Sequence, residues 1–364
     1  MIYLDHHSAT RPCTAALERM TPYLQDHWGA SFAPHRMGQE LIAALETRYQ
    51  MIYDLVNAAP TDQFVFTSSG AEAVNQVFWS VFVEKARKEG KCHIIISELE
   101  DAPTMQCAKR LEELGCYIKI APQKSNGQID LEKLKELINP RTALISVTMA
   151  HGLTGVIQPV EEIIQLAKEK GVLLHLDATY AIGKYPFSFE SDYLTFSGDR
   201  IHSVKGSGAL FAKATAPLSP FILGGNEQGT LRGGSFDIPS FMALSAAAQQ
   251  SLLYLDMMAL EVVRLRDLFE TEVKASVLYK DSFRLPNTTT LIFDKVHQEA
   301  LLYILNRKGI YASIGGSYAS HLGRIDESAI SFSLSRMTTE DEIRRAAGII
   351  NEAVKQLQKI SEDL

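Results

Sequence analysis

Residues 143–177 read ALISVTMAHGLTGVIQPVEEIIQLAKEKGVLLHLD and contain the pattern that decides the fold. An apolar run of strand length, Ala143 to Val147, precedes an amphipathic stretch, Val160 to Lys170, and a second apolar run, Val172 to Leu176. Gly171 stands where a glycine commonly ends a helix. A strand, a helix and a strand in this order predict a βαβ unit with parallel strands.

The same alternation continues on both sides of this segment through the first two thirds of the chain. Further apolar runs predict strands, and the amphipathic stretches between them predict helices. The predicted strands are Gln63 to Phe66, His93 to Ile96, Tyr117 to Ile120 and Leu194 to Phe196; the predicted helices are Ala71 to Gly90, Thr104 to Leu114 and Leu131 to Ile138. We therefore expect an α/β fold with a mostly parallel sheet.

The last third of the sequence has a different pattern. A helical periodicity runs from about Phe241 to near Val273, and an alternating segment, Thr288 to Phe293, follows it. No Gly/Ser linker intervenes, although 364 residues are enough for more than one domain. We expect a large domain over residues 1–250 and a smaller α+β C-terminal domain over residues 251–364.

The composition excludes several classes of protein. A net charge of −7 gives no basic surface for nucleic acid, so we expect no nucleic-acid partner. The four cysteines form no CxxC pair and show no metal-ligand spacing, which is typical of a reducing compartment. No secretory signal is evident in residues 1–12, and no apolar run approaches the ~20 residues that span a bilayer. We expect a cytoplasmic protein with no membrane association.

Five short segments occur in an order that is typical of one family: MIYLDHHSAT (1–10), GASFAPHRMG (29–38), FTSSGAEAVN (66–75), TGVIQP (154–159) and HLDA (175–178). This ordered set resembles the cysteine desulfurases, class V members of the fold type I enzymes that use pyridoxal phosphate (PLP). The resemblance covers nearly the whole chain. It implies the fold type I PLP-dependent transferase architecture, with a mostly parallel seven-stranded sheet in the large domain and residues 1–15 packed on the small one.

One residue in this resemblance decides what chemistry is open to the chain. Residues 196–210, FSGDRIHSVKGSGAL, are similar to the family's signature around the lysine that binds the cofactor, and Arg200 stands at that lysine. A Schiff base needs an amine that can lose its proton, whereas a guanidinium stays protonated. Lys205 aligns with a second lysine of the signature, five residues further along, and we do not expect it to take over the role.

The resemblance also identifies the residues that would hold the cofactor phosphate. Ser69, Gly70 and Ala71 open a predicted helix, whose amides could bind an anion, but Ala71 replaces a family threonine. Ser69 and Glu72 also have capping-box spacing, which would satisfy the helix end without a ligand, so both interpretations stay open.

Two more residues stand at phosphate positions. Ser197 and His202 could add contacts to the phosphate. Asp199 replaces a family histidine, and its carboxylate would repel the phosphate.

The positions around the cofactor ring have changed as well. Asp177 matches the family carboxylate at the pyridinium nitrogen, although an aspartate that caps a turn at the end of a strand is the alternative interpretation. Asp101 replaces the imidazole that stacks on the ring, Gly152 replaces an amide, and Tyr180 replaces a glutamine. These coordinated changes favour loss of the cofactor.

The sulfur-accepting cysteine of the family is also missing. Tyr318 stands at its position in the loop 312–320, and a phenol with a reference pKa of about 10 cannot replace a thiolate. Arg336 matches the arginine that holds the substrate carboxylate in the family. Its alternative role is an ion pair with a neighbouring acid, with Thr338 capping the last helix. Residues 224–235 look like the family loop that reaches into the neighbouring subunit, which implies a dimer.

The sequence suggests two further arrangements around the altered site. Arg200 is expected to pair with Asp177 or Asp101, because a buried charge needs compensation. His6, His7, His151 and Asp177 could meet as a metal site, but a histidine pair also occurs in the family's opening segment. We predict no metal.

These residues lead to one functional interpretation and one alternative. We interpret the chain as a cysteine desulfurase-like protein whose PLP-dependent activity is lost and which binds no cofactor. Such a protein would act as a dimeric, non-catalytic partner or scaffold in sulfur or iron-sulfur metabolism. It would be a homodimer or a heterodimer with an active paralogue, with a sulfur-transfer protein as a further partner. The alternative is an enzyme of the same class that binds PLP or its amine form with altered chemistry.

Overall fold

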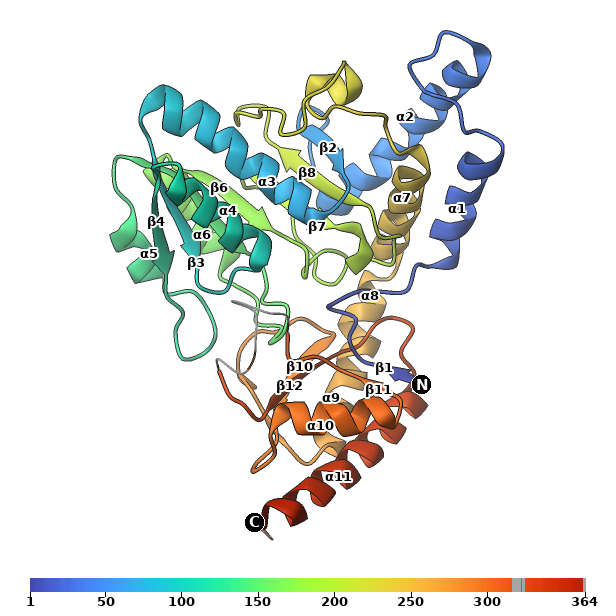
Figure 1. The fold of residues 1–364 in the computed structure, drawn as a ribbon, viewed down its shortest axis with the longest axis vertical. Coiled ribbons are helices and arrows are strands. Elements are labelled where there is room, and N and C mark those ends of the chain that lie inside the picture. The colour runs from blue at the N-terminus through green and yellow to red at the C-terminus, as the bar shows by residue number, and fades with distance from the viewer. Residues whose placement is uncertain (316–321, 323–324, 363–364) are drawn as a thin grey trace.

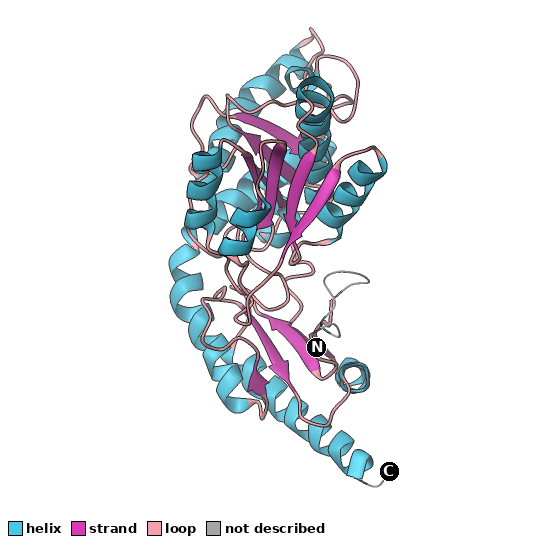
Figure 2. Ribbon diagram, turned by 90° about the vertical axis from the view of Figure 1, so that its left-hand side faces the viewer, coloured by secondary structure: helices cyan, strands magenta, loops and turns pink. Residues whose placement is uncertain are grey.

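A large sheet forms the centre of one of the two lobes visible in the ribbon (Figures 1 and 2). The structure is a computed structural model and describes residues 1–315, 322 and 325–362. The seven strands of the sheet have the order β2-β8-β7-β6-β5-β3-β4. Their bounds are β2 Gln63–Thr67, β3 His93–Ser97, β4 Tyr117–Ala121, β5 Thr142–Thr148, β6 Leu173–Asp177, β7 Tyr193–Ser197 and β8 Gly208–Ala212.

The predicted α/β fold with a mostly parallel, seven-stranded sheet is confirmed. β8 runs antiparallel to its neighbours β2 and β7, and the other pairings in the sheet are parallel. Every residue of β3 and β5 is buried, as expected for parallel strands that are covered on both faces. Helices cover both faces of the sheet (Figure 2).

The helices of this lobe follow the strands in the expected alternation. Their bounds are α1 Thr14–Gln25, α2 Arg36–Val56, α3 Gly70–Val81, α4 Ala102–Glu113, α5 Leu131–Leu137, α6 Val160–Lys170 and α7 Ile238–Leu253. α7 packs against α1 and α2, and α3 packs against α4. Among the described residues, no helix is long and apolar enough to cross a bilayer.

The second lobe is built on a three-stranded antiparallel sheet with a separate hydrophobic core. Its elements are β9 Ser276–Val277, β10 Thr288–Ile292, β12 Ala329–Ser333, α9 Val263–Glu272, α10 Gln298–Arg307 and α11 Glu340–Glu362. The start of the chain joins this lobe: β1 (Ile2–Tyr3) pairs with β11 (Ile310–Tyr311), and Ile2 and Leu4 belong to its core.

The helical segment predicted from about Phe241 to near Val273 is confirmed, but it is interrupted at Tyr254. α7 ends at Leu253, α8 (Leu255–Met257) follows, and a π-helical stretch, Met258–Val262, leads into α9. α7 lies in the core of the large lobe and α9 lies against the core of the small one. A π-helical turn is a common place for a helix to change direction, as this segment must when it leaves one core for the other. The expected boundary between residues 250 and 251 falls inside α7.

The carboxyl ends of β5, β6 and β7 meet at one edge of the large sheet. Thr148 at the end of β5 lies opposite Asp177 at the end of β6, and Asp177 lies opposite Thr195 in β7. Open α/β sheets bind ligands at this edge. The residues identified at this edge therefore come from neighbouring strand ends.

Candidate functional site

Arg200 lies in a short 3-10 turn, Gly198–Arg200, directly after β7. Its Nη1 is 2.8 Å from Oδ2 of Asp199, and both side chains are 17% exposed. Ser197 Oγ donates to the other oxygen of Asp199 at 2.8 Å, which fixes that carboxylate. The expected pairing of Arg200 with Asp177 or Asp101 is therefore wrong. The neighbouring Asp199 compensates the charge within the same turn.

Tyr180 lies against Asp101, Gly152 and Arg200, which the sequence identified one by one as departures from the family. Its hydroxyl donates to the carboxylate of Asp101, and its ring lies so close to Gly152 that an added Cβ there would be 2.4 Å from Cζ. The guanidinium of Arg200 is 6.0 Å from the centre of the same ring. Any side chain at residue 152 would overlap the tyrosine ring. The changes at residues 101, 152 and 180 thus form one packing unit beside Arg200.

Asp177 caps a turn at the end of β6. Its Oδ1 accepts a hydrogen bond from the amide of Thr179 at 2.9 Å, which matches the turn-capping interpretation. Burial raises the pKa of Asp177 to about 6. This pKa leaves the carboxylate ionised at neutral pH, with the charge of Arg200 nearby as a favourable influence.

Glu100 is a buried acid beside this site for which no role was predicted. Its Oε1 accepts hydrogen bonds from Ser97 Oγ at 2.6 Å and from the amide of Thr148 at 2.7 Å, while Oε2 has no partner among the described residues. Burial raises the pKa of Glu100 to about 8, helped by the nearby charges of Asp177 and Asp101. Glu100 is therefore protonated at neutral pH.

The start of α3 is occupied by its own capping contacts. Ser69 Oγ accepts from the amide of Glu72 at 3.2 Å, and Glu72 Oε2 accepts from the amide of Ser68 at 2.8 Å. Arg232 Nε pairs with the same glutamate at 3.0 Å. The side-chain contacts match the capping interpretation. Ala71 is exposed and offers no hydroxyl.

The other two residues expected at a phosphate are engaged elsewhere. Ser197 donates its hydroxyl to Asp199. The imidazole Nδ1 of His202 lies 2.8 Å from the carbonyl oxygen of Arg11, and the amide of His202 donates to Thr10 Oγ1 at 2.8 Å. His202 is thus tied to the N-terminal segment.

The residues at these positions do not fit PLP held as a Schiff base. Position 200 offers no amine, and the carboxylate of Asp199 lies where the family has a histidine at the phosphate. The Tyr180 ring fills the space over Gly152. We therefore derive no reaction step through this cofactor.

Arg336 lies in the small lobe, just after β12. Its guanidinium is 4.7 Å from the centre of the Tyr254 ring, and burial lowers its pKa. The expected alternative, an ion pair with a neighbouring acid, does not occur among the described residues; Cys13 and Tyr254 are the groups nearby that favour the charged guanidinium. The cap of α11 was also misplaced, because Thr339 exchanges hydrogen bonds with Glu342, while Thr338 accepts from the amide of Ser335.

The sequence interpretation missed Lys184. This residue lies in the turn after β6, is 8% exposed, and donates from Nζ to the carbonyl oxygen of Arg200 at 3.3 Å. Burial, together with the charge of Arg200, lowers its pKa to about 7. Lys205, the lysine considered as a substitute, is exposed. The signal for Lys184 was its place seven residues after Asp177, in the loop at the ligand-binding edge of the sheet.

The sequence identified two further sets of residues, the sulfur-acceptor position and a possible cluster of histidines. Tyr318 lies outside the described residues. The imidazole of His7 contacts Ser333 Oγ at 3.0 Å, and that of His151 contacts Thr154 Oγ1 at 2.9 Å. Across residues 1–315, 322 and 325–362, no group of three or more His, Cys, Asp or Glu side chains could hold a metal ion.

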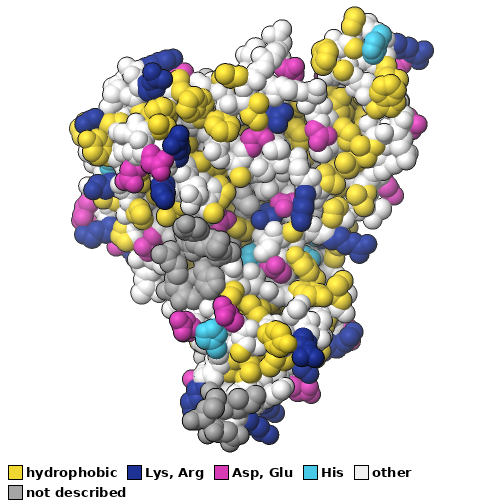
Figure 3. All heavy atoms as spheres, viewed as in Figure 1, with side chains coloured by type: hydrophobic (Ala, Val, Ile, Leu, Met, Phe, Trp, Pro, Cys, Tyr) yellow, Lys and Arg dark blue, Asp and Glu magenta, His cyan; other side chains and the backbone are white. Residues whose placement is uncertain are grey.

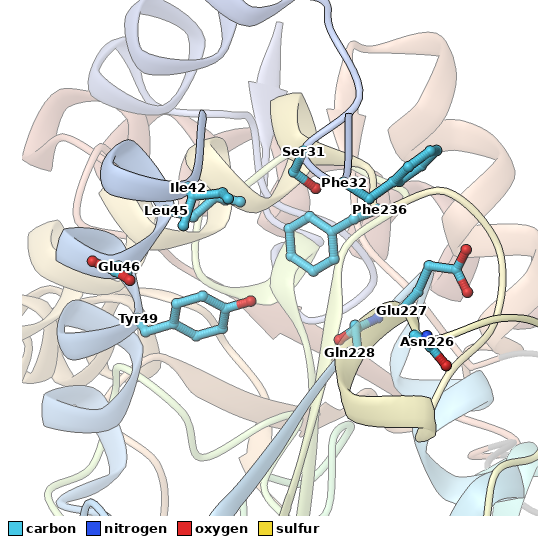
Figure 4. Close-up of a pocket in the computed structure, with 10 residues that line it drawn as sticks. All are labelled: Ser31, Phe32, Ile42, Leu45, Glu46, Tyr49, Asn226, Glu227, Gln228 and Phe236. Atoms are coloured by element: carbon cyan, nitrogen blue, oxygen red, sulfur yellow. The ribbon is translucent and has the colours of Figure 1, made fainter. Parts of the chain in front are cut away.

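The loop 224–235 lies beside an open groove. The side-chain amide of Gln228 exchanges hydrogen bonds with the backbone of Phe66 at the end of β2, at 2.7 and 2.9 Å. A groove of about 510 Å³ separates this loop from α2, and the rings of Tyr49 and Phe236 point into it (Figure 4). Phe32 at its rim is 73% exposed. Hydrophobic side chains also gather over α1 and α2 on the surface (Figure 3).

Comparisons with known proteins show the family and the fold of the chain. Residues 2–346 match the family model described as aminotransferase class-V. A cysteine desulfurase of Nostoc sp. is 32% identical over 384 aligned positions, which cover 99% of this chain and 94% of the relative. A cysteine desulfurase of Cereibacter sphaeroides is 33% identical over 385 positions, with 99% and 97% covered. A solved NifS-like protein superposes with a TM-score of 0.92 at 29% identity, covering 98% of this chain and 100% of that one.

Proposed function

Because this chain belongs to the class V aminotransferase family and is homologous to cysteine desulfurases, we propose that it is a desulfurase-like protein without PLP-dependent activity. The observation that carries the proposal is the packing unit of Arg200, Tyr180, Gly152 and Asp101. A guanidinium cannot form the Schiff base, and the tyrosine ring excludes a side chain at residue 152. Replacing Arg200 alone by lysine would therefore leave Tyr180, Gly152 and Asp101 unchanged.

The proposed role is that of a dimeric, non-catalytic partner or scaffold in sulfur or iron-sulfur metabolism. The retained loop 224–235 and the groove beside it, which apolar and polar side chains line together, support an assembly, either with a second copy or with an active paralogue. A sulfur-transfer protein is the further partner proposed. The exposed Phe32 at the rim of the groove is a side chain that a partner would cover.

A second candidate function rests on two retained residues. Asp177 lies at the end of β6 with Arg200 as a nearby positive charge, and Arg336 has no carboxylate partner among the described residues. An enzyme that binds PLP or its amine form non-covalently, with altered chemistry, would use these two groups. This candidate differs from the first in one property, which is measurable binding of the cofactor.

The test is reduction of the purified protein with borohydride in the presence of PLP. We expect no absorbance band of an aldimine in the protein as purified and no lysine that is pyridoxylated stoichiometrically at limiting PLP, as judged by mass spectrometry. A catalytically active desulfurase treated in parallel is the positive control. Stoichiometric pyridoxylation of one buried lysine would overturn the proposal. Calorimetric binding without covalent labelling would favour the second candidate.

A further inference from the structure

Two cysteines begin two neighbouring strands of the large sheet, and the proposed function makes no use of them. Cys92 directly precedes β3, and Cys116 directly precedes β4, the edge strand beside it (Figure 1). These strands run parallel, with His93 opposite Tyr117. The amide of Tyr117 donates to the carbonyl oxygen of Cys92 at 2.8 Å, so the ladder of hydrogen bonds begins at the cysteines. Cys92 and Cys116 therefore lie opposite each other.

The two cysteine side chains lie on the same face of the sheet, because side chains alternate between the faces along a strand. Cys92 and Ile94 pack in one hydrophobic core, and Cys116 and Ile118 pack in the same one. Ile95, on the opposite face, packs in a different core. Paired strands are about 4.8 Å apart, and the two Cα atoms of a disulfide are ~4.4–6.8 Å apart. The backbone therefore has a spacing that a disulfide accepts.

The two thiols differ in how easily a molecule in solvent reaches them. Cys92 is partly exposed, whereas Cys116 is 5% exposed. Burial raises the pKa of Cys116 to about 11, and the nearby charge of Cys92 contributes to this rise. A small oxidant therefore meets Cys92 first, and Cys116 lies behind it as a buried thiol.

Arg141 provides a positive charge at the more exposed thiol. Its Nη2 donates to Sγ of Cys92 at 2.8 Å. The same guanidinium is 5.7 Å from the centre of the Tyr117 ring, in the residue directly after Cys116. A cation beside a thiol favours the thiolate, which is the form that reacts with oxidants. The contact thus gives the Cys92 sulfur a partner for that negative charge.

We propose that hydrogen peroxide converts Cys92 and Cys116 into a reversible disulfide. The Cys92 thiolate forms a bond to one peroxide oxygen, the O–O bond breaks and hydroxide leaves, so that the sulfur becomes a sulfenic acid. The sulfur of Cys116 then attacks that of Cys92, the S–O bond breaks, and the hydroxyl group leaves with the Cys116 proton as water. The two sulfurs together lose two electrons. The peroxide gains them and becomes two molecules of water once the hydroxide takes up a proton.

A disulfide at this place would fasten the edge of the sheet. β4 is the last strand of the sheet and pairs with β3, so the bond would link it covalently to its neighbour. The oxidised protein should therefore unfold at a higher temperature than the reduced protein. The other two cysteines are placed differently, because Cys107 lies in α4 and Cys13 packs in the core on the opposite face of the sheet. Neither of them is in register with Cys92.

The experiment is peptide mapping of the full reduced chain after treatment with equimolar hydrogen peroxide. Remaining thiols are alkylated, and the chain is digested without a reductant. Cys92 and Cys107 lie in one tryptic peptide, so a second protease that cleaves after Glu98 is needed to separate them. We expect a peptide that contains Cys92 joined to one that contains Cys116. Added dithiothreitol should release both thiols.

Three variants test the separate steps. Cys116→Ser removes the second thiol, so the sulfenic acid of Cys92 should accumulate and react with dimedone. Arg141→Gln removes the positive charge at Cys92 and should slow formation of the disulfide several-fold, whereas Arg141→Lys should retain most of the rate. Cys107→Ser is the matched control, because it removes another buried thiol of the same core and should leave the disulfide unchanged.

Three outcomes would overturn the proposal: no linked peptide in the unmodified protein, a link that includes Cys107 in place of Cys116, or an unchanged rate in Arg141→Gln. Thermal unfolding of the reduced variants identifies a change that comes from misfolding, and in that case the linked peptide of the unmodified protein decides the matter. The cysteines lie at the opposite edge of the sheet from Arg200. The proposal can therefore fail while the proposed function stands, and the reverse also holds.

Discussion

At the scale of single residues, the altered site is held by contacts between side chains that are far apart in sequence. Asp101, Gly152 and Tyr180 come from three different loops and meet in one packing unit. The sequence identified each of them as a departure from the family, but the contact between them could not be predicted. It depends on how the ends of β3, β5 and β6 are placed beside one another.

Arg200 and Asp199 provide the first prediction. Arg200→Ala leaves the Asp199 carboxylate without its partner while it is still mostly buried, so we expect the free energy of unfolding to fall by about 1–3 kcal/mol. Denaturant unfolding measures the change. Arg345→Ala is the matched control, because its pair with Asp341 is exposed and should contribute little. Equal losses in the two variants would contradict the prediction.

Gly152 provides the second prediction. Gly152→Ala forces a Cβ against the Tyr180 ring, so we expect a loss of about 1–3 kcal/mol in the free energy of unfolding. The double variant Gly152→Ala with Tyr180→Gln should recover part of this loss. Gly348→Ala, at an open position in α11, is the control and should gain about 0.5–1 kcal/mol. A tolerated Gly152→Ala would show that the ring can move aside.

Glu100 provides a prediction about pH. Its pKa is raised from 4.5 to about 8 in the folded protein, so the folded state holds a proton that the unfolded state releases across this range. The free energy of unfolding therefore falls as pH rises between these values, by at most about 1.4 kcal/mol per unit. Glu100→Gln removes this dependence. Unfolding of both proteins at several pH values isolates the effect, and parallel profiles would refute it.

At the scale of elements, the strands and the helical join between the lobes were predictable, but the interruption of that join at Tyr254 was not. Apolar runs such as those of β3 and β5 predict buried strands because parallel strands are covered on both faces. The break between α7 and α9 has no glycine or proline to mark it. α7 and α9 pack against two different hydrophobic cores. The periodicity of one segment shows which of its residues are buried, but not against which core they pack.

The N-terminus of α3 allows a test between two interpretations of Ser69, as a helix cap or as part of an anion site. If Ser69 is a cap, Ser69→Ala should cost about 1 kcal/mol of unfolding free energy, because the amide of Glu72 loses its acceptor. The loss should be the same with and without added inorganic phosphate. Thermal unfolding with and without phosphate measures this. Phosphate stabilisation that Ser69→Ala abolishes would instead identify an anion site.

At the scale of the whole molecule, the open groove beside α2 predicts an interface. Phe32→Glu places a charge on an apolar rim, so we expect it to shift the protein toward monomer in sedimentation experiments. Leu114→Glu, at an exposed leucine on the end of α4, is the control and should leave the assembly unchanged. An unmodified protein that is already monomeric, or a Phe32→Glu dimer, would contradict the prediction.

The pairing of β1 with β11 has a consequence for the order in which the chain folds. Ile2 lies beside Ile310, so β1 can pair with β11 only after the long stretch of chain between them has been made. Contacts of such long sequence separation form slowly, because closing the loop costs entropy before the contact stabilises anything. The core of the small lobe, which includes Ile2 and Leu4, is therefore completed by a slow contact between distant parts of the chain.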